Sequence, residues 1–411
     1  MIKKGAVEQR INTYKKELSD ELDDILNYWI NNMQDTKHGG FYGKIDNSNH
    51  VIPYSPKGSV LNARILWSFS AAYNLTGNKK YLEIANRAYQ YVIDHIIDKK
   101  FGGVYWTVDH FGNKLDSKKQ VYACAFTIYA FSEYYKASKK KEVLNEVIGL
   151  FNLLVDKSFD QHKTGYLEAF TEDWQPINDL RLSAKDANEK KTMNTHLHVL
   201  EGYTNLYRVW PDETLKKQIG ILLNNFLDHF IDTKTGHLNL FFDEDWNKRS
   251  TLISYGHDIE AAWLMLESAE VIKDSEMTEK LKAIATKISE ATLEGLDADG
   301  GLWYEYEPAE DHLIKEKHWW VQAEAMVGFF SAWQITENEK YLDLSIKNWD
   351  FVKNKILDKK NGEWFWGTDE NDQVMATEDK AGLWKCPYHN SRACIEIIKR
   401  IDEISNYEKD L

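Results

Sequence analysis

Apolar residues recur along this chain with the spacing of α-helices, and two kinds of helix alternate. One kind is amphipathic and highly charged, with apolar residues at i, i+3, i+4 and i+7, as in 80–97 and 338–357. The other kind is apolar and aromatic around most of its surface, as in 61–73 and 321–333, so it must be covered on most sides. The pattern predicts twelve helices, over 6–32, 60–76, 80–97, 119–137, 141–156, 192–208, 213–231, 256–273, 276–294, 319–335, 338–355 and 388–404.

A short motif separates the amphipathic helix of each pair from the apolar helix that follows it. This Asp–Gly motif consists of an Asp, a few polar residues, one or two Gly and an aromatic-rich segment. Its last Gly recurs at intervals of 61 to 71 residues, so the chain is an internal repeat of an outer helix, a β-like turn and an inner helix. The six copies begin at Asp35, Asp98, Asp160, Asp232, Asp297 and Asp358.

Six such helix pairs account for nearly the whole chain and can close into a ring. We therefore predict an all-α (α/α)6 barrel of twelve helices in six hairpin repeats, with residues 1–411 forming a single catalytic domain. The alternative is an open solenoid of helical pairs. Closure is favoured because the sequence has no obvious capping repeat, and the low count of six Pro fits a helical protein.

Composition and charge exclude several classes of protein. With 51 basic and 65 acidic residues, the chain has a net charge of −14, which argues against nucleic-acid binding. It has no run of 18 apolar residues that could span a membrane, and its N-terminus lacks the apolar core of a signal peptide. The three cysteines form no CxxC motif. We expect a reduced, cytoplasmic protein.

Histidines cluster where the predicted barrel would place a site. All inner helices of such a barrel run parallel, so their N-termini gather around one funnel. Four histidines lie at these helix starts, and imidazoles together suit proton transfer in both directions. Two of them, His196 and His198, point to different faces of one helix. We expect His198 to face the site, because Asn194 lies four residues before it; the other two are His257 and His389.

Two other chemistries compete with proton transfer. His257 and Glu260, with His198 and His389, could form a mixed metal-ligand set, although the sequence has neither HExxH nor a Cys cluster. Glu260 and Glu324 could instead be the paired carboxylates of a glycosidase. These acids could equally hydrogen-bond to His and Arg. The excess of histidines over isolated carboxylates favours proton transfer over hydrolysis.

One arginine and two tryptophans complete the candidates at this level. Arg64 lies in a strongly apolar helix, where a guanidinium needs a partner or a ligand. It could stabilise a developing enediolate oxygen, or form a salt bridge to Glu324 or another acid of the inner helices. Trp320 and Trp384 flank the predicted funnel. Each could stack against a sugar or simply pack in the core, in a chain that is 13% aromatic.

Several long segments resemble the cellobiose 2-epimerases of the N-acylglucosamine 2-epimerase superfamily. They are 191–207 (KTMNTHLHVLEGYTNLY), 254–264 (SYGHDIEAAWL) and 384–401 (WKCPYHNSRACIEIIKRI), with shorter matches around Arg64 and over 319–330. The resemblance implies an (α/α)6 barrel. It also implies reversible C2 epimerisation of the reducing-end glucose of β-1,4-linked disaccharides to mannose, with no metal and no organic cofactor.

The resemblance also assigns roles to residues. It makes His257 and His389 the general acid/base pair and His198 a supporting histidine. Glu324 joins the residues expected to bind substrate, and Cys124 departs from the family, which often has Gln there. The other residues expected around the sugar are Arg64, Tyr122, Asn194 and Glu260, the aromatic walls Trp320 and Trp384, and Asp186 in a loop.

The sequence thus predicts a monomeric, cytoplasmic cellobiose 2-epimerase that binds a β-1,4-linked disaccharide, no nucleic acid and no membrane. A ring-opened enediolate would be the intermediate. Within the superfamily, the alternative is a monosaccharide epimerase or aldose–ketose isomerase acting on mannose or N-acylglucosamine. Outside it, the alternatives are a glycoside hydrolase using Glu260 and Glu324, and a non-catalytic sugar-binding protein.

Overall fold

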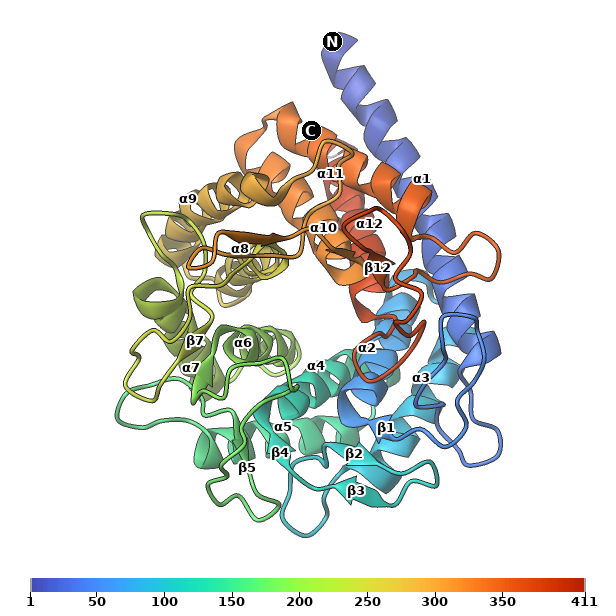
Figure 1. The fold of residues 1–411 in the computed structure, drawn as a ribbon, viewed down its shortest axis with the longest axis vertical. Coiled ribbons are helices and arrows are strands. Elements are labelled where there is room, and N and C mark those ends of the chain that lie inside the picture. The colour runs from blue at the N-terminus through green and yellow to red at the C-terminus, as the bar shows by residue number, and fades with distance from the viewer. Residues whose placement is uncertain (1, 410–411) are drawn as a thin grey trace.

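The computed structural model describes residues 2–409, which form a closed ring of paired helices (Figure 1). Within this range every helix is too short or too polar to cross a bilayer. The twelve α-helices are α1 (Ile2–Asn32), α2 (Ser59–Thr76), α3 (Lys79–Tyr91), α4 (Val121–Ser138), α5 (Lys141–Lys157), α6 (Met193–Tyr207), α7 (Glu213–Asn225), α8 (Tyr255–Val271), α9 (Ser275–Thr292), α10 (Trp319–Thr336), α11 (Glu339–Phe351) and α12 (Tyr388–Lys409).

The even-numbered helices form the inner ring. Each contacts the next one along the chain, and α12 contacts α2, so the ring closes. The odd-numbered helices lie outside, and α1 packs against α12, which brings the two ends of the chain together. The predicted (α/α)6 barrel is therefore confirmed, and the open solenoid is wrong.

Burial explains which helices lie inside. In α2, every residue from 59 to 72 is buried, as expected for a helix that is apolar on all sides. In α3, the buried residues are confined to one face, including Tyr81, Ile84 and Ala88. Three outer helices end in a π-helical turn that the predicted ranges run through without a break. These turns are η1 (Val92–Ile96), η2 (Phe226–Phe230) and η4 (Val352–Ile356), while α9 ends in the 3-10 turn η3 (Leu293–Gly295).

Short strands tie neighbouring repeats together at one end of the barrel. A strand leads directly into each of five inner helices and pairs antiparallel with a strand of the following repeat. The strands before the helices are β1 (Lys57–Gly58), β4 (Lys119–Gln120), β6 (Lys191–Thr192), β8 (Ile253–Ser254) and β11 (Lys317–His318). Their partners are β2 (Thr107–Val108), β5 (Ala169–Phe170), β7 (Phe241–Phe242), β9 (Glu305–Glu307) and β12 (Gly367–Thr368), with β3 (Lys114–Asp116) and β10 (His312–Ile314) added at two edges.

A buried lysine holds the Asp of the motif in five repeats. Lys57 Nζ lies 2.8 Å from Asp35 Oδ2, and the same ion pair recurs in the other four. The second oxygen of the Asp accepts backbone N–H groups of the turn, as in Asp98 with Lys100 and Phe101. The other pairs are Lys119–Asp98, Lys191–Asp160, Lys317–Asp297 and Lys380–Asp358.

Replacing one such lysine should strongly destabilise the protein. Lys119 and Asp98 are both fully buried, so Lys119→Met leaves a buried carboxylate without its counter-ion. We expect the free energy of unfolding to fall by about 3–5 kcal/mol, measured by urea denaturation. Lys353→Met breaks a partly exposed pair with Glu17 and should cost no more than about 1 kcal/mol. Equal effects of the two substitutions would contradict this account.

Candidate active site

Equivalent positions of the six inner helices meet at the barrel axis. The sixth residues of α2 to α10 and the fifth of α12 are buried and form one layer. Neighbours within it are in contact. The Arg64 guanidinium lies 4.1 Å from the Phe126 ring centroid, and that ring lies 4.6 Å from the His198 ring. The six residues are Arg64, Phe126, His198, Glu260, Glu324 and Arg392.

Arg392 is the hub of the charged half of this layer. Its Nη2 donates to Glu260 Oε1 and to Glu324 Oε1, both at 2.6 Å, and its Nη1 donates to Glu201 and Tyr388. The Tyr388 hydroxyl also donates to Glu201 Oε1 at 2.5 Å. One guanidinium thus neutralises much of the charge of three buried carboxylates, and its planar fork suits that task.

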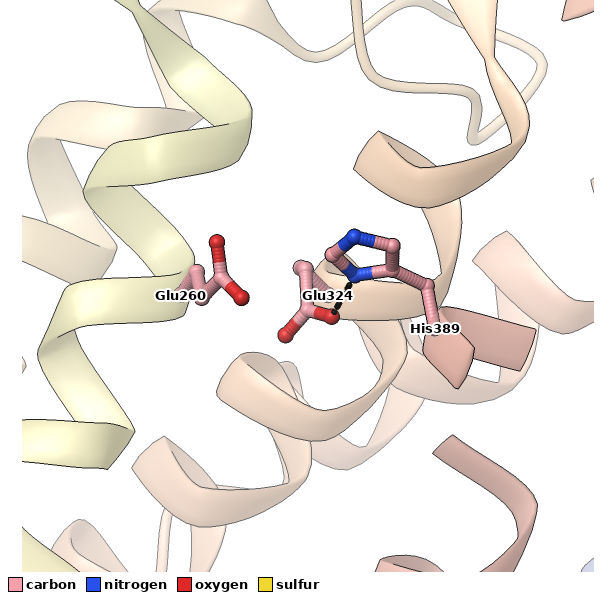
Figure 2. Close-up of side chains that lie close together, drawn as sticks. All are labelled: Glu260, Glu324 and His389. Atoms are coloured by element: carbon pink, nitrogen blue, oxygen red, sulfur yellow. Dashed lines mark hydrogen bonds and ion pairs between the residues drawn. The ribbon is translucent and has the colours of Figure 1, made fainter. Parts of the chain in front are cut away.

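Two of these carboxylates orient histidines. Glu324 Oε1 lies 2.7 Å from His389 Nδ1, as Figure 2 shows, and Glu201 Oε2 lies 2.9 Å from His198 Nδ1. The second oxygen of Glu324 accepts the indole N–H of Trp263 at 3.2 Å. Each carboxylate is therefore held on both sides, and each imidazole is held in one orientation.

His257 lies in the same region but has a neutral partner. Its Nδ1 is 2.8 Å from the Ser254 hydroxyl. Its ring centroid lies 4.7 Å from that of Trp320, which in turn lies 5.7 Å from the ring of His389. Trp320 can approach this closely because Gly256 has no side chain: a Cβ there would meet the indole at 2.6 Å. His257 and His389 lie on different helices, and both therefore contact Trp320.

The two ring nitrogens distinguish these histidines from structural ones. In the described residues, Nε2 of His198, His257 and His389 has no hydrogen-bond partner, while Nδ1 is bonded. His196 uses both nitrogens, with Nδ1 at 2.6 Å from the Thr192 carbonyl and Nε2 accepting the backbone N–H of Tyr166. Three imidazoles thus keep one nitrogen available for a substrate, and His196 does not.

Burial keeps the three site histidines neutral. It lowers the pKa of His257 to about 3, with the nearby His198 acting in the same direction. It also lowers the pKa of His198, although Glu201 opposes the shift. Burial and the charges of Arg64 and Arg392 lower the pKa of His389 well below its ordinary value. A neutral imidazole with a free Nε2 can accept a proton.

The carboxylates differ in their pKa values because their partners differ. Burial alone would raise the pKa of Glu201, but Arg392 and His198 outweigh burial and lower that pKa to about 2. Burial and the charge of Glu324 raise the pKa of Glu260 well above its ordinary value. Burial also raises the pKa of Glu324, against the effect of Arg392.

The two acids of the hydrolase alternative share one counter-ion. Glu260 and Glu324 bind the same nitrogen of Arg392. A glycosidase needs its carboxyl groups on either side of the scissile bond. Hydrogen bonding to His and Arg, the other interpretation of these acids, is what the structure shows.

The same region contains the residues that could ligate a metal. Glu260, Glu324 and His389 each offer one ligand atom, and these atoms lie within 4.8 Å of one another (Figure 2). Among the described residues, His198 and His257 are not part of this group, so the four-residue set considered from sequence is not assembled. A cation bound there would also be repelled by the Arg392 guanidinium. The carboxylates have a fixed counter-ion already.

Arg64 has aromatic rather than acidic partners. It donates to the Tyr122 hydroxyl at 2.8 Å, and its guanidinium lies 4.7 Å from the Tyr388 ring centroid. The alternative salt bridge to Glu324 is wrong, because Arg392 occupies that place. Arg64 Nε is buried without a partner in the described residues. Among residues 2–409, this side chain is a buried positive charge without a carboxylate in an ion pair with it.

The remaining candidates are two residues of the inner-helix end, Trp384 and Asn194, and one residue of the loop before β6, Asp186. Trp384 lies 6.0 Å from Tyr122 and 5.8 Å from Trp106, centroid to centroid. Asn194 Oδ1 is buried without a partner among the described residues, so it can accept a hydrogen bond from a hydroxyl group. Asp186 is tied to its own loop, where its carboxylate accepts the backbone N–H of Ser183 at 2.7 Å.

Cys124 belongs to a row of side chains that support the Asp–Gly turns. Each accepts a backbone N–H just after the glycine of a motif, at 2.8 Å in three of the four cases. The Cys124 thiol is buried beside Val104 and close to Gly103. We therefore expect its departure from the family to affect turn packing and not substrate preference. The row consists of Cys124, His196, Asp258 and Gln322, the fourth residues of α4 to α10.

Sequence reasoning missed the residues that hold the histidines. Glu201 follows His198 by three residues, and Arg392 follows His389 by three, so each shares a helix face with a chosen histidine. A charged residue inside an apolar helix was the signal that could have found them. The other residues of the site that sequence reasoning missed are Ser254, Trp263 and Tyr388.

Together the fold and this cluster define an (α/α)6 barrel with a histidine-rich site suited to proton transfer. The chain belongs to the N-acylglucosamine 2-epimerase family, whose model matches residues 39–393. This confirms the resemblance seen in the sequence.

The comparisons also identify individual relatives. The chain is 48% identical over 385 residues to the cellobiose 2-epimerase of Bacteroides fragilis, covering 93% of this chain and 98% of that protein. The solved cellobiose 2-epimerase of Bacillus thermoamylovorans B4167 is 40% identical and matches with a TM-score of 0.90, over 95% of this chain and all of that one. The D-mannose isomerase of Marinomonas mediterranea is 24% identical, over 88% of this chain and 92% of that protein.

Proposed function

We propose that this protein is a carbohydrate epimerase that interconverts glucose and mannose at the reducing end of cellobiose and related β-1,4-linked disaccharides. The observation that carries the proposal is the pair His257 and His389, two neutral imidazoles on different inner helices, each with an available Nε2. The identity of 48% to a cellobiose 2-epimerase supports the substrate.

The reaction we propose begins with opening of the sugar ring to its aldehyde, which acidifies the proton on C2. One histidine takes that proton through Nε2, and the electron pair moves to the C1 oxygen to give an enediolate. The intermediate turns about C2–C3. The other histidine takes up a proton from solvent, which the negative charge of the enediolate favours, and delivers it through Nε2 to the opposite face of C2. Inversion requires bases on two sides, and His257 and His389 supply them.

The surrounding residues bind and polarise the sugar in this proposal. Arg64 holds the enediolate oxygen, because its charge has no carboxylate partner in the part of the chain that the structure describes and lies in a buried, aromatic environment. His198 assists ring opening. The sugar hydroxyls contact Asn194, Tyr122, Glu260 and Glu324, the walls are Trp320 and Trp384, and Asp186 acts from its loop.

The alternative within the family is a monosaccharide epimerase or isomerase. The similarity to a D-mannose isomerase at 24% identity keeps this alternative open. Incubation with cellobiose, mannose and N-acetylmannosamine, followed by chromatography, separates the two. Conversion of cellobiose to glucosyl-mannose is the expected result. Turnover of the monosaccharides alone would contradict the proposed substrate, and release of glucose would contradict epimerisation.

We further propose a single-domain, monomeric enzyme that resides in the cytoplasm and needs no cofactor. All three cysteines are unpaired and buried, as is usual in a reducing compartment. Arg392 already provides the positive charge beside the carboxylates, so activity should survive chelation. Gel filtration at micromolar concentration tests the monomer.

The lowered histidine pKa values predict the pH dependence. The base must be neutral, and a lowered pKa keeps it neutral until the pH falls through that lower value. The acid limb of kcat/KM should therefore lie below pH 6.5, the ordinary histidine pKa. Initial rates from pH 4 to 9 measure it. A midpoint at or above 6.5 would rule out these histidines as desolvated bases.

A further inference from the structure

A continuous chain of hydrogen bonds joins two of the proposed site histidines through one arginine. It runs from His198 to Glu201, from Glu201 to Arg392, from Arg392 to Glu324, and from Glu324 to His389. Every side chain in it is buried. The histidines come from α6 and α12, and Glu324 comes from α10. Three helices of the ring therefore converge on Arg392.

We propose that Arg392 is a positioning residue that fixes His198 and His389 together, by holding the two carboxylates that orient them. This inference rests on the proposed function, because it assumes that these histidines act on the sugar. Each carboxylate directs an imidazole through Nδ1, which leaves Nε2 for the substrate. Arg392 touches neither histidine through a hydrogen bond, so its effect passes through Glu201 and Glu324.

The geometry requires a guanidinium at this place. Its two terminal nitrogens bind different acids: Nη1 donates to Glu201, and Nη2 donates to Glu260 and Glu324. A lysine ammonium is a single point charge and cannot bind in both directions at these positions. Without the arginine, three buried carboxylates would repel one another and separate.

Tyr388 keeps this arginine in place. Its ring centroid lies 4.3 Å from the Arg392 guanidinium and 4.7 Å from that of Arg64, so the ring contacts both cations. Its hydroxyl binds Glu201. The two buried arginines therefore have separate tasks: Arg392 organises the acids, and Arg64 remains available to the sugar.

The test begins with Arg392→Lys, which retains the charge and loses the fork. We expect kcat to fall about 10²-fold, the cost of a misplacement of about 1 Å. Binding of cellobiitol, a reduced disaccharide that cannot epimerise, should change less than threefold. The matched control is Arg400→Lys, two turns further along α12, where the guanidinium binds Gln334. This variant should keep the kcat of the unchanged enzyme.

NMR spectra of the imidazoles report directly whether His198 and His389 are held in place. With 15N-labelled histidine, the Nδ1–H signals of His198 and His389 should weaken together in Arg392→Lys, while that of His257, bonded to Ser254, persists. In Arg392→Met, the loss of positive charge should also move the acid limb of kcat/KM to higher pH, since Arg392 lowers the pKa of His389. A merely structural arginine would move neither readout.

A double-mutant cycle tests the route through Glu324. Arg392→Lys and Glu324→Gln should be non-additive, with the double variant losing little more than the worse single one. A kcat for Arg392→Lys within threefold of the unchanged enzyme, or additive losses, would overturn the inference. If His389→Asn also kept full activity, the proposed function itself would fail, and the two failures are thus distinguishable.

Discussion

Replacing His389 by asparagine should lower kcat by about 10²- to 10⁴-fold, and His257→Asn should do the same. In the proposed mechanism, each substitution removes the nitrogen that exchanges a proton with C2 on its side of the sugar. The asparagine amide can still donate to Glu324 at position 389, so the surrounding hydrogen bonds survive. The measurement is the initial rate of glucosyl-mannose formation from cellobiose, with the fold checked by circular dichroism.

The double variant and a neighbouring histidine provide the controls. Because both histidines serve one reaction, His257→Asn combined with His389→Asn should lose little more than the worse single variant. His196→Asn should destabilise the protein and leave kcat of the folded enzyme unchanged, since both nitrogens of His196 bind the main chain. Near-normal activity in either site variant would contradict the acid/base assignment.

Replacing Arg64 by methionine should lower kcat by about 10²- to 10³-fold. In the proposed mechanism, the negative charge of the enediolate develops beside Arg64, a buried cation without a carboxylate partner in the described residues. The loss should fall mainly on kcat, because the charge exists only after the proton has left C2.

Arg64→Lys separates the effect of the positive charge from that of the forked shape of the guanidinium. It should recover part of the rate, since an ammonium supplies the charge but not the fork that reaches Tyr122. Steady-state kinetics on both variants, with thermal unfolding measured in parallel, provide the test. A rise in KM with kcat unchanged for Arg64→Met would show that Arg64 binds the ground state and does not stabilise the intermediate.

Much of the fold was readable from the sequence because each inner helix is apolar on all sides and each outer helix on one face. The recurring Asp–Gly motif then determined the number of pairs. Periodicity could not show the π-helical turns after α3, α7 and α11, because the first and last residues of each turn are apolar and buried, as in the α-helix before it. It also did not show the lysine that pairs with the motif Asp in five repeats, because the two lie on opposite sides of a long connection.

Within one helix, the sequence predicted which residues face the site, but it did not predict the contacts between helices. Spacing separated His198 from His196, and the structure places them on different faces of α6. The partnership of Arg392 with Glu201, Glu260 and Glu324 joins four helices that lie up to 191 residues apart in sequence. A single sequence shows that each of these charges is buried, but not which of them meet.

The most direct test of the central claim is an NMR time course with cellobiose in D2O, in the presence of a chelator. The account predicts glucosyl-mannose that carries deuterium at C2, because a histidine that exchanges with solvent returns the proton. Glucosyl-mannose with hydrogen retained at C2 throughout, or free glucose as the product, would contradict proton transfer by His257 and His389.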